Sequence, residues 1–133
     1  MATLTITPAN VALSGTGNHT TFDLEADVTI ARGKVVKRNS SNEGELADKD
    51  SSDCDGICIS GGDNGDKIIV VSKGLVTIGA TTVQGKPYFL GDSGGIVDDI
   101  ADVASGEFPV LIGFGNSTTE IMVNIVKSLV AVP

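Results

Sequence analysis

The sequence predicts an all-β protein, a compact antiparallel β-barrel or sandwich of short strands. Short runs of apolar and β-branched residues recur along the chain, and turns rich in glycine separate them at intervals of about ten residues. The 17 glycines are spread over the sequence rather than gathered in one loop. Helix signals are few, so strands joined by tight turns account for most of the chain.

The first segment, residues 2–13, predicts a strand because Leu4 and Ile6 alternate with threonines. Pro8 ends this pattern. Residues 14–19 are flexible turn material. We therefore expect an extended N-terminal arm, separate from the core and suited to pairing with a neighbouring subunit.

The division predicted for the chain is an arm with a flexible linker over residues 1–20 and a single β-domain over residues 21–133. A chain of 133 residues usually buries one core. No second domain on a linker is expected at this length.

In the middle of the chain, β-branched residues favour strands at 28–30 and 35–36. Residues 39–55 are polar and predict an exposed loop around one short element. The apolar runs 57–59 and 68–71 flank a segment rich in glycine and aspartate, which predicts a β-hairpin.

The last third repeats this character. Strands are expected at 75–78, 88–90, 110–112 and 121–126. Between them, apolar residues three apart in 97–103 predict one helical turn or a loop packed by three side chains.

The two halves also predict an internal duplication, with pseudo-repeats at about 26–72 and 74–127. Three pairs of segments correspond in order: Asp27–Ile30 with Leu75–Ile78, Gly33–Lys34 with Gly85–Lys86, and Gly44–Leu46 with Gly94–Ile96. Each copy then closes with an apolar run, a turn and a last strand. Neither copy could bury its hydrophobic face alone, so a shared scaffold is expected.

Composition excludes several kinds of partner. Nine Lys and Arg stand against 17 Asp and Glu, giving a net charge of −8, which repels phosphate backbones and argues against nucleic acid. No run approaches the roughly 18 apolar residues of a membrane span, and the start lacks a signal peptide. We expect a soluble chain made in the cytoplasm.

Residues 91–95, Gly-Asp-Ser-Gly-Gly, match the pentapeptide around the nucleophile of trypsin-like proteases. That chemistry would need Ser93 within hydrogen-bond reach of a base, and His19 is the one histidine. His19 lies in a glycine-containing linker, and the chain is too short for the two barrels of such a protease. The preferred interpretation is a turn between strands, and no catalytic residue is expected.

Metal sites and cofactors are not expected. An acidic cluster that a hard cation could use consists of Asp48, Asp50, Asp53 and Asp55. It lacks the glycine and glutamate of an EF-hand, which favours a solvated loop. Cys54 and Cys58 could bridge across a turn, but reduced thiols are preferred, and with one histidine they do not complete a zinc site.

The ordered segments of the chain resemble a family of small phage virion proteins, the head-decoration or capsid-cement group. The resemblance rests on the following segments: 1–11, 33–36, 46–48, 56–60, 76–80, 85–90, 94–96, 105–113 and 117–121. It covers nearly the whole chain, although each segment is short. Cys54, Cys58 and the heavily acidic loop are not features of that family.

The resemblance implies a structural protein, not an enzyme, that decorates the outside of the capsid and reinforces contacts between major capsid protein subunits. It implies a homotrimer located on the virion exterior, with no cofactor, nucleic acid or membrane. The residues expected to contact the capsid or a neighbouring subunit belong to the arm: Thr3, Leu4, Thr5, Ile6 and Val11.

Two alternatives remain open. One is a host-surface or glycan-binding tail or fibre module, weakened because sugar faces usually stack on Trp or Tyr and only Tyr88 is present. The other is a serine hydrolase using Ser93.

Overall fold

The computed structural model describes residues 3–15, 19–128 and 130–133, and its strands form one continuous sheet. The elements in chain order are η1 (Pro8–Asn10), β1 (Val11–Leu13), β2 (Thr20–Ala26), β3 (Val35–Arg38), β4 (Glu43–Leu46), β5 (Gly56–Cys58), β6 (Lys67–Ile78), β7 (Pro87–Leu90), β8 (Ile96–Val97), η2 (Ile100–Asp102), β9 (Leu111–Gly115) and β10 (Glu120–Val126). The all-β prediction is confirmed. The two η elements are short 3₁₀ turns.

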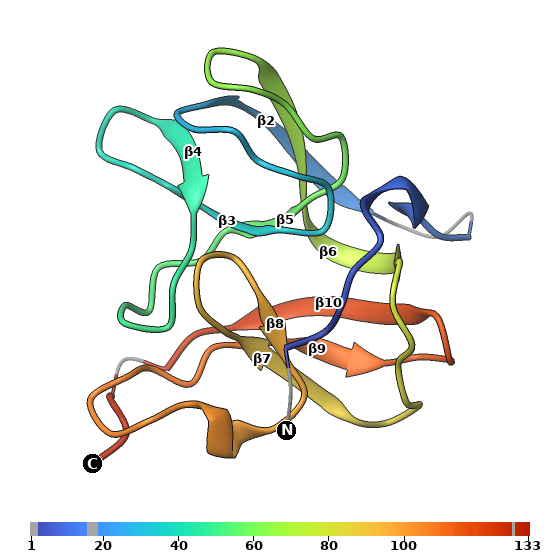
Figure 1. The fold of residues 1–133 in the computed structure, drawn as a ribbon, viewed down its shortest axis with the longest axis vertical. Coiled ribbons are helices and arrows are strands. Elements are labelled where there is room, and N and C mark those ends of the chain that lie inside the picture. Colours follow the sequence, from blue (N-terminus) through green and yellow to red (C-terminus); the bar gives the residue numbers. More distant parts are fainter. Residues whose placement is uncertain (1–2, 16–18, 129) are drawn as a thin grey trace.

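The sheet is mixed rather than purely antiparallel. Its strand order is β2-β4-β3-β5-β6-β10-β9-β7-β8, with β1 paired to β6, and β2 and β4 pair in parallel. Because β2 also pairs with β6, the five strands β2, β4, β3, β5 and β6 close into a small barrel. Figure 1 shows this first unit above a second unit, which consists of β7, β8, β9 and β10. The long strand β6 belongs to both units.

Most strand predictions are confirmed, with ends shifted by up to three residues. The described part of the alternating segment before Pro8 is not a strand and forms only the isolated bridge at Thr3. The runs 68–71 and 75–78 are parts of the single long strand β6. The hairpin turn before it contains Gly61 and Gly65, both with positive φ, as the glycine-rich sequence predicts. The helical turn expected within 97–103 is η2, and the acidic loop surrounds the short strand β4.

The strand expected at 28–30 is wrong. The chain bends after β2, where the Asp27 N–H donates to the Gly44 carbonyl, and Val28 and Thr29 are exposed. Only Ile30 pairs, in an isolated bridge to Gly62. The segment therefore is not the structural counterpart of 75–78, although both are rich in β-branched residues.

The order of strand pairing nevertheless repeats. In the first unit β4 pairs β3, β3 pairs β5, and β5 pairs β6; in the second β8 pairs β7, β7 pairs β9, and β9 pairs β10. The internal duplication and the boundaries proposed for it remain predictions that this repeated connectivity favours.

The described part of the N-terminal arm lies against its own chain. Thr3 bridges Val97 of β8, the Leu4 N–H donates to the Ile96 carbonyl, and the Thr7 N–H donates to the Gly79 carbonyl. Strand β1 then pairs with the end of β6. The arm thus lies between β8 and β6 and joins them. In the first unit the corresponding strands, β4 and β2, pair with each other directly.

The arm packs on the core instead of standing apart from it. The linker predicted after it falls partly on residues 16–18, which lie outside the described residues. The division into residues 1–20 and 21–133 remains a prediction.

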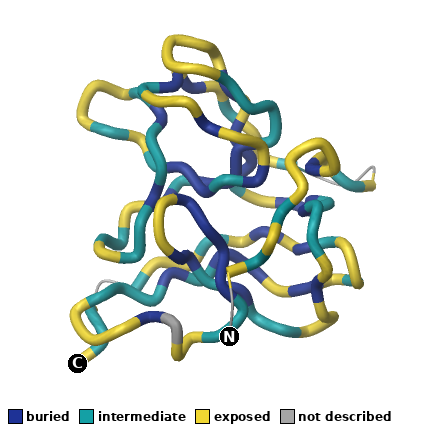
Figure 2. The backbone as a smooth tube through the Cα atoms, viewed as in Figure 1, coloured by how far each residue is buried: buried dark blue, intermediate teal, exposed yellow. Residues whose placement is uncertain are grey.

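Two hydrophobic cores lie on either side of a shared layer formed by β3, β5 and β6. Neighbouring residues in these strands point in opposite directions, as period-two alternation requires. The first core contains Val36, Cys58 and Val70, and the second contains Val35, Ile57 and Val71. Figure 2 shows this layer as buried backbone across the middle of the molecule.

Truncating Ile57 tests the shared layer. Its side chain is fully buried in the second core, so Ile57→Ala should lower the free energy of unfolding by about 2–5 kcal/mol. Ile69→Ala is the matched control, since Ile69 is 39% exposed on β6 and should change stability much less. Urea denaturation of both variants makes the comparison, and equal losses would contradict the assignment.

Candidate functional site

The five arm residues predicted as contacts divide into two groups. Thr3 and Thr5 are exposed and point outward. Leu4 and Ile6 are half-buried against the second core, and Val11 is 2% exposed within it. Only the threonines are therefore free to touch another molecule, while the three apolar residues hold the arm on its own chain.

An open groove runs beside the arm. It holds about 630 Å³ and is lined chiefly by small polar residues: Thr5, Thr7, Asn10, Thr77, Thr81 and Thr119. Hydroxyl and amide groups both donate and accept hydrogen bonds. The groove contains no ionisable side chain, so it suits the polar backbone of another chain better than a charged ligand.

The pentapeptide at 91–95 forms a turn that ties the two units together. Within it, the Gly91 N–H donates to the Gly95 carbonyl at 2.8 Å. Toward the first unit, the Gly94 N–H donates to the Ala47 carbonyl and the Gly94 carbonyl accepts from the Val35 N–H. The Gly94 φ of 77° explains the glycine at this close approach.

Ser93 and His19, the two residues of the protease hypothesis, have separate partners. The Ser93 N–H donates to the Asp48 carboxylate at 3.0 Å, and the residue has a φ of 49° in the turn. His19 Nε2 instead lies 2.9 Å from the Leu75 carbonyl oxygen on β6. No contact in the described residues joins the two side chains.

Two carboxylates of the acidic segment act as acceptors for nearby backbone. Asp48 accepts from the Asp50 and Ser93 N–H groups, and Asp55 accepts from the Arg38 N–H at 2.7 Å. No cluster of three or more metal-ligating side chains occurs among the described residues. These two carboxylates are thus directed at the protein backbone, whereas Asp50 and Asp53 are exposed.

Cys54 and Cys58 are both free and both buried. Cys54 packs in the second core and Cys58 in the first, on opposite sides of the shared layer. Burial, together with the neighbouring Asp55 carboxylate, raises the pKa of Cys54 to about 12. Both thiols serve as small apolar core groups.

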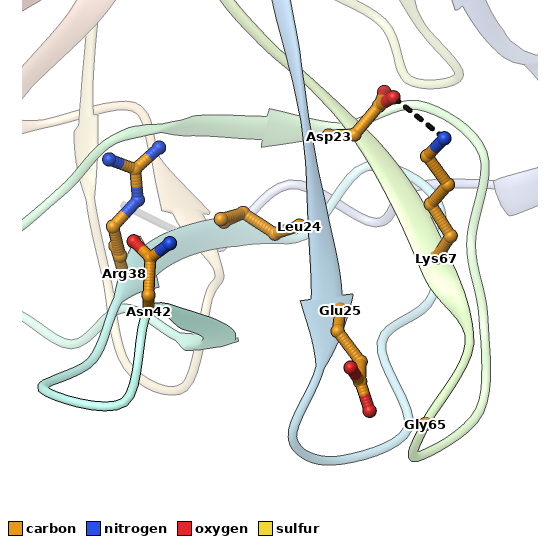
Figure 3. A pocket seen from close by; sticks show the side chains of 7 residues that line it. All are labelled: Asp23, Leu24, Glu25, Arg38, Asn42, Gly65 and Lys67. Atoms are coloured by element: carbon orange, nitrogen blue, oxygen red, sulfur yellow. Dashed lines mark ion pairs between the residues drawn. The ribbon is translucent and has the colours of Figure 1, made fainter.

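A second pocket opens on the first unit, between β2 and the β3–β4 turn (Figure 3). The ion pair between Lys67 Nζ and the Asp23 carboxylate, 3.1 Å, lies on one side, and Arg38 lies on the other, stacked 5.2 Å over the Phe22 ring. Leu24 projects between them. The charged side chains that line the pocket are of both signs and are exposed, so the pocket does not favour a ligand of one particular charge.

Sequence reasoning missed an apolar row on the outer face of the second unit. It consists of Leu75, Met122, Phe114 and Pro87, which lie opposite one another on β6, β10, β9 and β7. Phe114 is 48% exposed and Met122 44%. Alternation in residues 121–126 predicts that Met122 lies on the opposite face from its buried neighbours. It does not predict whether another part of the chain covers that face.

Comparison with known proteins assigns no family. No protein-family model matches the sequence, and no curated protein is significantly similar to it. In the described part of the chain, no helix is long and apolar enough to cross a bilayer.

Removing the Asp48 side chain should loosen the tie between the units. Asp48→Ala deletes the acceptor for two backbone N–H groups, at an expected cost of about 1–2 kcal/mol in unfolding free energy. Asp50→Ala removes an exposed carboxylate from the same loop and should stay within about 0.5 kcal/mol. Urea denaturation compares them; a silent Asp48→Ala would contradict the role given to this carboxylate.

The buried Cys54 thiol predicts a loss of stability in alkali. Its folded pKa lies above its unfolded value of about 9, so its contribution is fully present below pH 9 and declines as the pH rises toward 12. The stability difference between the wild type and Cys54→Ala should shrink across that window, as measured by urea denaturation at fixed pH values. A difference that is constant from pH 7 to pH 11 would argue against a buried neutral thiol.

Proposed function

We propose that this chain is a structural, non-enzymatic virion protein that decorates the outside of a phage capsid and reinforces contacts between major capsid protein subunits. The observation that carries the proposal is the ordered resemblance of its segments to the head-decoration group. The major capsid protein is the proposed partner, and the homotrimer implied by the resemblance is part of the proposal.

The fold supports such a role in mechanical terms. Two cores share one layer of strands, and the turn at 91–95 and the arm add hydrogen bonds between distant parts of the chain. Close-packed protein cores have low compressibility and transmit strain. A body of this kind transmits force between the capsid subunits that it bridges.

The arm and the groove beside it supply the proposed capsid contact. Thr3, Thr5 and Thr7 face outward, and the threonine-lined groove next to them offers hydrogen bonds to an extended segment of the capsid protein. Individual contacts of this size are weak. Repetition over a symmetric shell raises their combined strength without new contacts.

The net charge of −8 is compatible with this position. A cement protein bridges capsomers on the side away from the packaged nucleic acid, and an acidic surface does not compete for phosphate partners. The same charge keeps the free protein in solution before assembly.

Binding to heads that lack the protein tests the proposal. The variant Thr5→Arg/Thr7→Arg places bulky cations in the groove without touching the core, and its affinity for the heads should fall by about tenfold or more. Thr29→Arg changes an exposed threonine on the first unit and should bind as the wild type does. Co-sedimentation and electron microscopy measure attachment and location.

Absence of wild-type binding, or a few copies confined to the tail, would contradict decoration; the second result would favour the host-surface alternative. Full binding by the double arginine variant would show that the capsid contact lies outside the groove. Deleting residues 2–13 is a poorer experiment, because it would uncover the second core around Val11.

A further inference from the structure

The outer face of β6, β10, β9 and β7 carries two parallel rows of apolar side chains. The first is the row of Leu75, Met122, Phe114 and Pro87, and the second is Val126, Leu111 and Phe89. An irregularity at Gly113 turns both Ile112 and Gly113 inward, so that Leu111 and Phe114 both face outward. No described element covers Phe114, Met122 or Val126, which are 44–53% exposed.

Opposite charges flank the first row at equal spacing. Lys73 precedes Leu75 by two residues on β6, and Glu120 precedes Met122 by two residues on β10. Because β6 and β10 are antiparallel, the two charges lie on opposite sides of the row, each about 6–7 Å from it along its strand. Their cross-strand neighbours, Asn124 and Thr77, are neutral.

The negative member of this pair is held in place. The Glu120 carboxylate accepts hydrogen bonds from the Ser14 hydroxyl and, at 3.0 Å, from the Ser117 hydroxyl. These hydrogen bonds lower the pKa of Glu120, so it is ionised at neutral pH. Lys73 forms no ion pair within the described part of the chain, so its charge is available to another molecule.

We propose that this face binds a second copy of the chain through a two-fold contact whose axis runs along the first apolar row. Rotation about that axis places each row residue against the same residue of the second copy. It also carries Lys73 to the side occupied by Glu120 of the second copy, and Glu120 to the side of the other Lys73. One operation therefore forms two ion pairs around an apolar centre, which is the self-complementarity that an isologous interface requires.

Charge favours a copy of this chain over an unrelated partner. The chain carries −8, but the strand residues of this face include one lysine and one glutamate and so sum to zero. Two acidic molecules meet here without like-charge repulsion at the contact. The geometry is that of two twisted sheets stacked face to face with their side chains interleaved.

The size of the face sets the expected affinity. Even if all seven apolar side chains of the two rows were covered, their exposed parts would amount to only roughly 300–400 Å², against about 800 Å² per partner in a standard stable complex. The two-fold contact is therefore weak in dilute solution, with dimers forming at high protein concentration. It is tested on the purified protein, in the absence of capsids.

Charge reversal gives a test specific to this geometry. Sedimentation equilibrium over a wide concentration range should show pairwise association of the wild type, as a monomer–dimer equilibrium or, for the homotrimer of the proposed function, as a trimer–hexamer equilibrium. Lys73→Glu and Glu120→Lys should each weaken dimerisation by about tenfold, since each replaces two attractions by two repulsions. The double variant Lys73→Glu/Glu120→Lys should recover dimerisation, because both pairs are re-formed with reversed sign.

Two controls separate the contact from general effects. Arg32→Glu changes the net charge by the same amount as Lys73→Glu on an exposed residue of the first unit, and should leave dimerisation unchanged. Should Glu120→Lys unfold the protein by losing its serine hydrogen bonds, Phe114→Thr/Met122→Thr tests the same face with strand-forming residues. Ile69→Thr is its matched control on the outer side of β6.

A protein that stays monomeric up to millimolar concentration would overturn the proposal. So would pairwise association that is insensitive to Phe114→Thr/Met122→Thr, or a double charge reversal that folds without restoring this association. Loss of capsid binding in the row variant of a strictly monomeric protein would assign the face to the capsid instead.

Discussion

The structure depends on one layer that is buried on both faces, which consists of β5 and the residues that pair with it, Val35–Val36 of β3 and Val70–Val71 of β6. Adjacent residues such as Ile57 and Cys58 enter different cores, so a shift of pairing by one residue would exchange the contents of both cores at once. At the residues where these strands pair, Val35, Val36, Ile57, Cys58, Val70 and Val71 are all buried, so no charged or hydroxyl side chain occupies these positions. As a result, the ionic and hydroxyl groups of the chain gather on its outer faces, loops and turns.

The two units on either side of this layer close in different ways. The first unit closes directly through the parallel β2–β4 contact, whereas the second leaves a gap between β8 and β6 that the arm fills. The arm contributes apolar side chains to the second core, so its attachment is part of folding. Its exposed threonines therefore occupy fixed positions on the surface, which lowers the entropy that a partner would have to remove on binding.

Sequence patterns gave the strand content because each apolar run is short, β-branched and bounded by turn residues. They failed at 28–30, since the same residue types occur there in a bend whose hydrogen bonds come from Gly44 and Gly62, distant in sequence. The sequence could not show which strand the arm pairs with, because an unpaired strand edge has the same pattern whether its own chain or a neighbouring subunit pairs with it. The outward position of Phe114 depends on the irregularity at Gly113, which alternation does not register.

The repeated strand order has unequal consequences for the two units. On the first, the outer side of β2 and β6 carries the charged pair Asp23 and Lys67. On the second, the corresponding strands β6 and β10 contribute to the apolar row. An uncovered row of this kind on strands is an aggregation hazard unless something limits how another molecule can approach. The charges of Lys73 and Glu120 impose that limit. They favour the orientation of a second copy that places Lys73 beside Glu120, and they oppose an orientation that places Lys73 beside Lys73 and Glu120 beside Glu120.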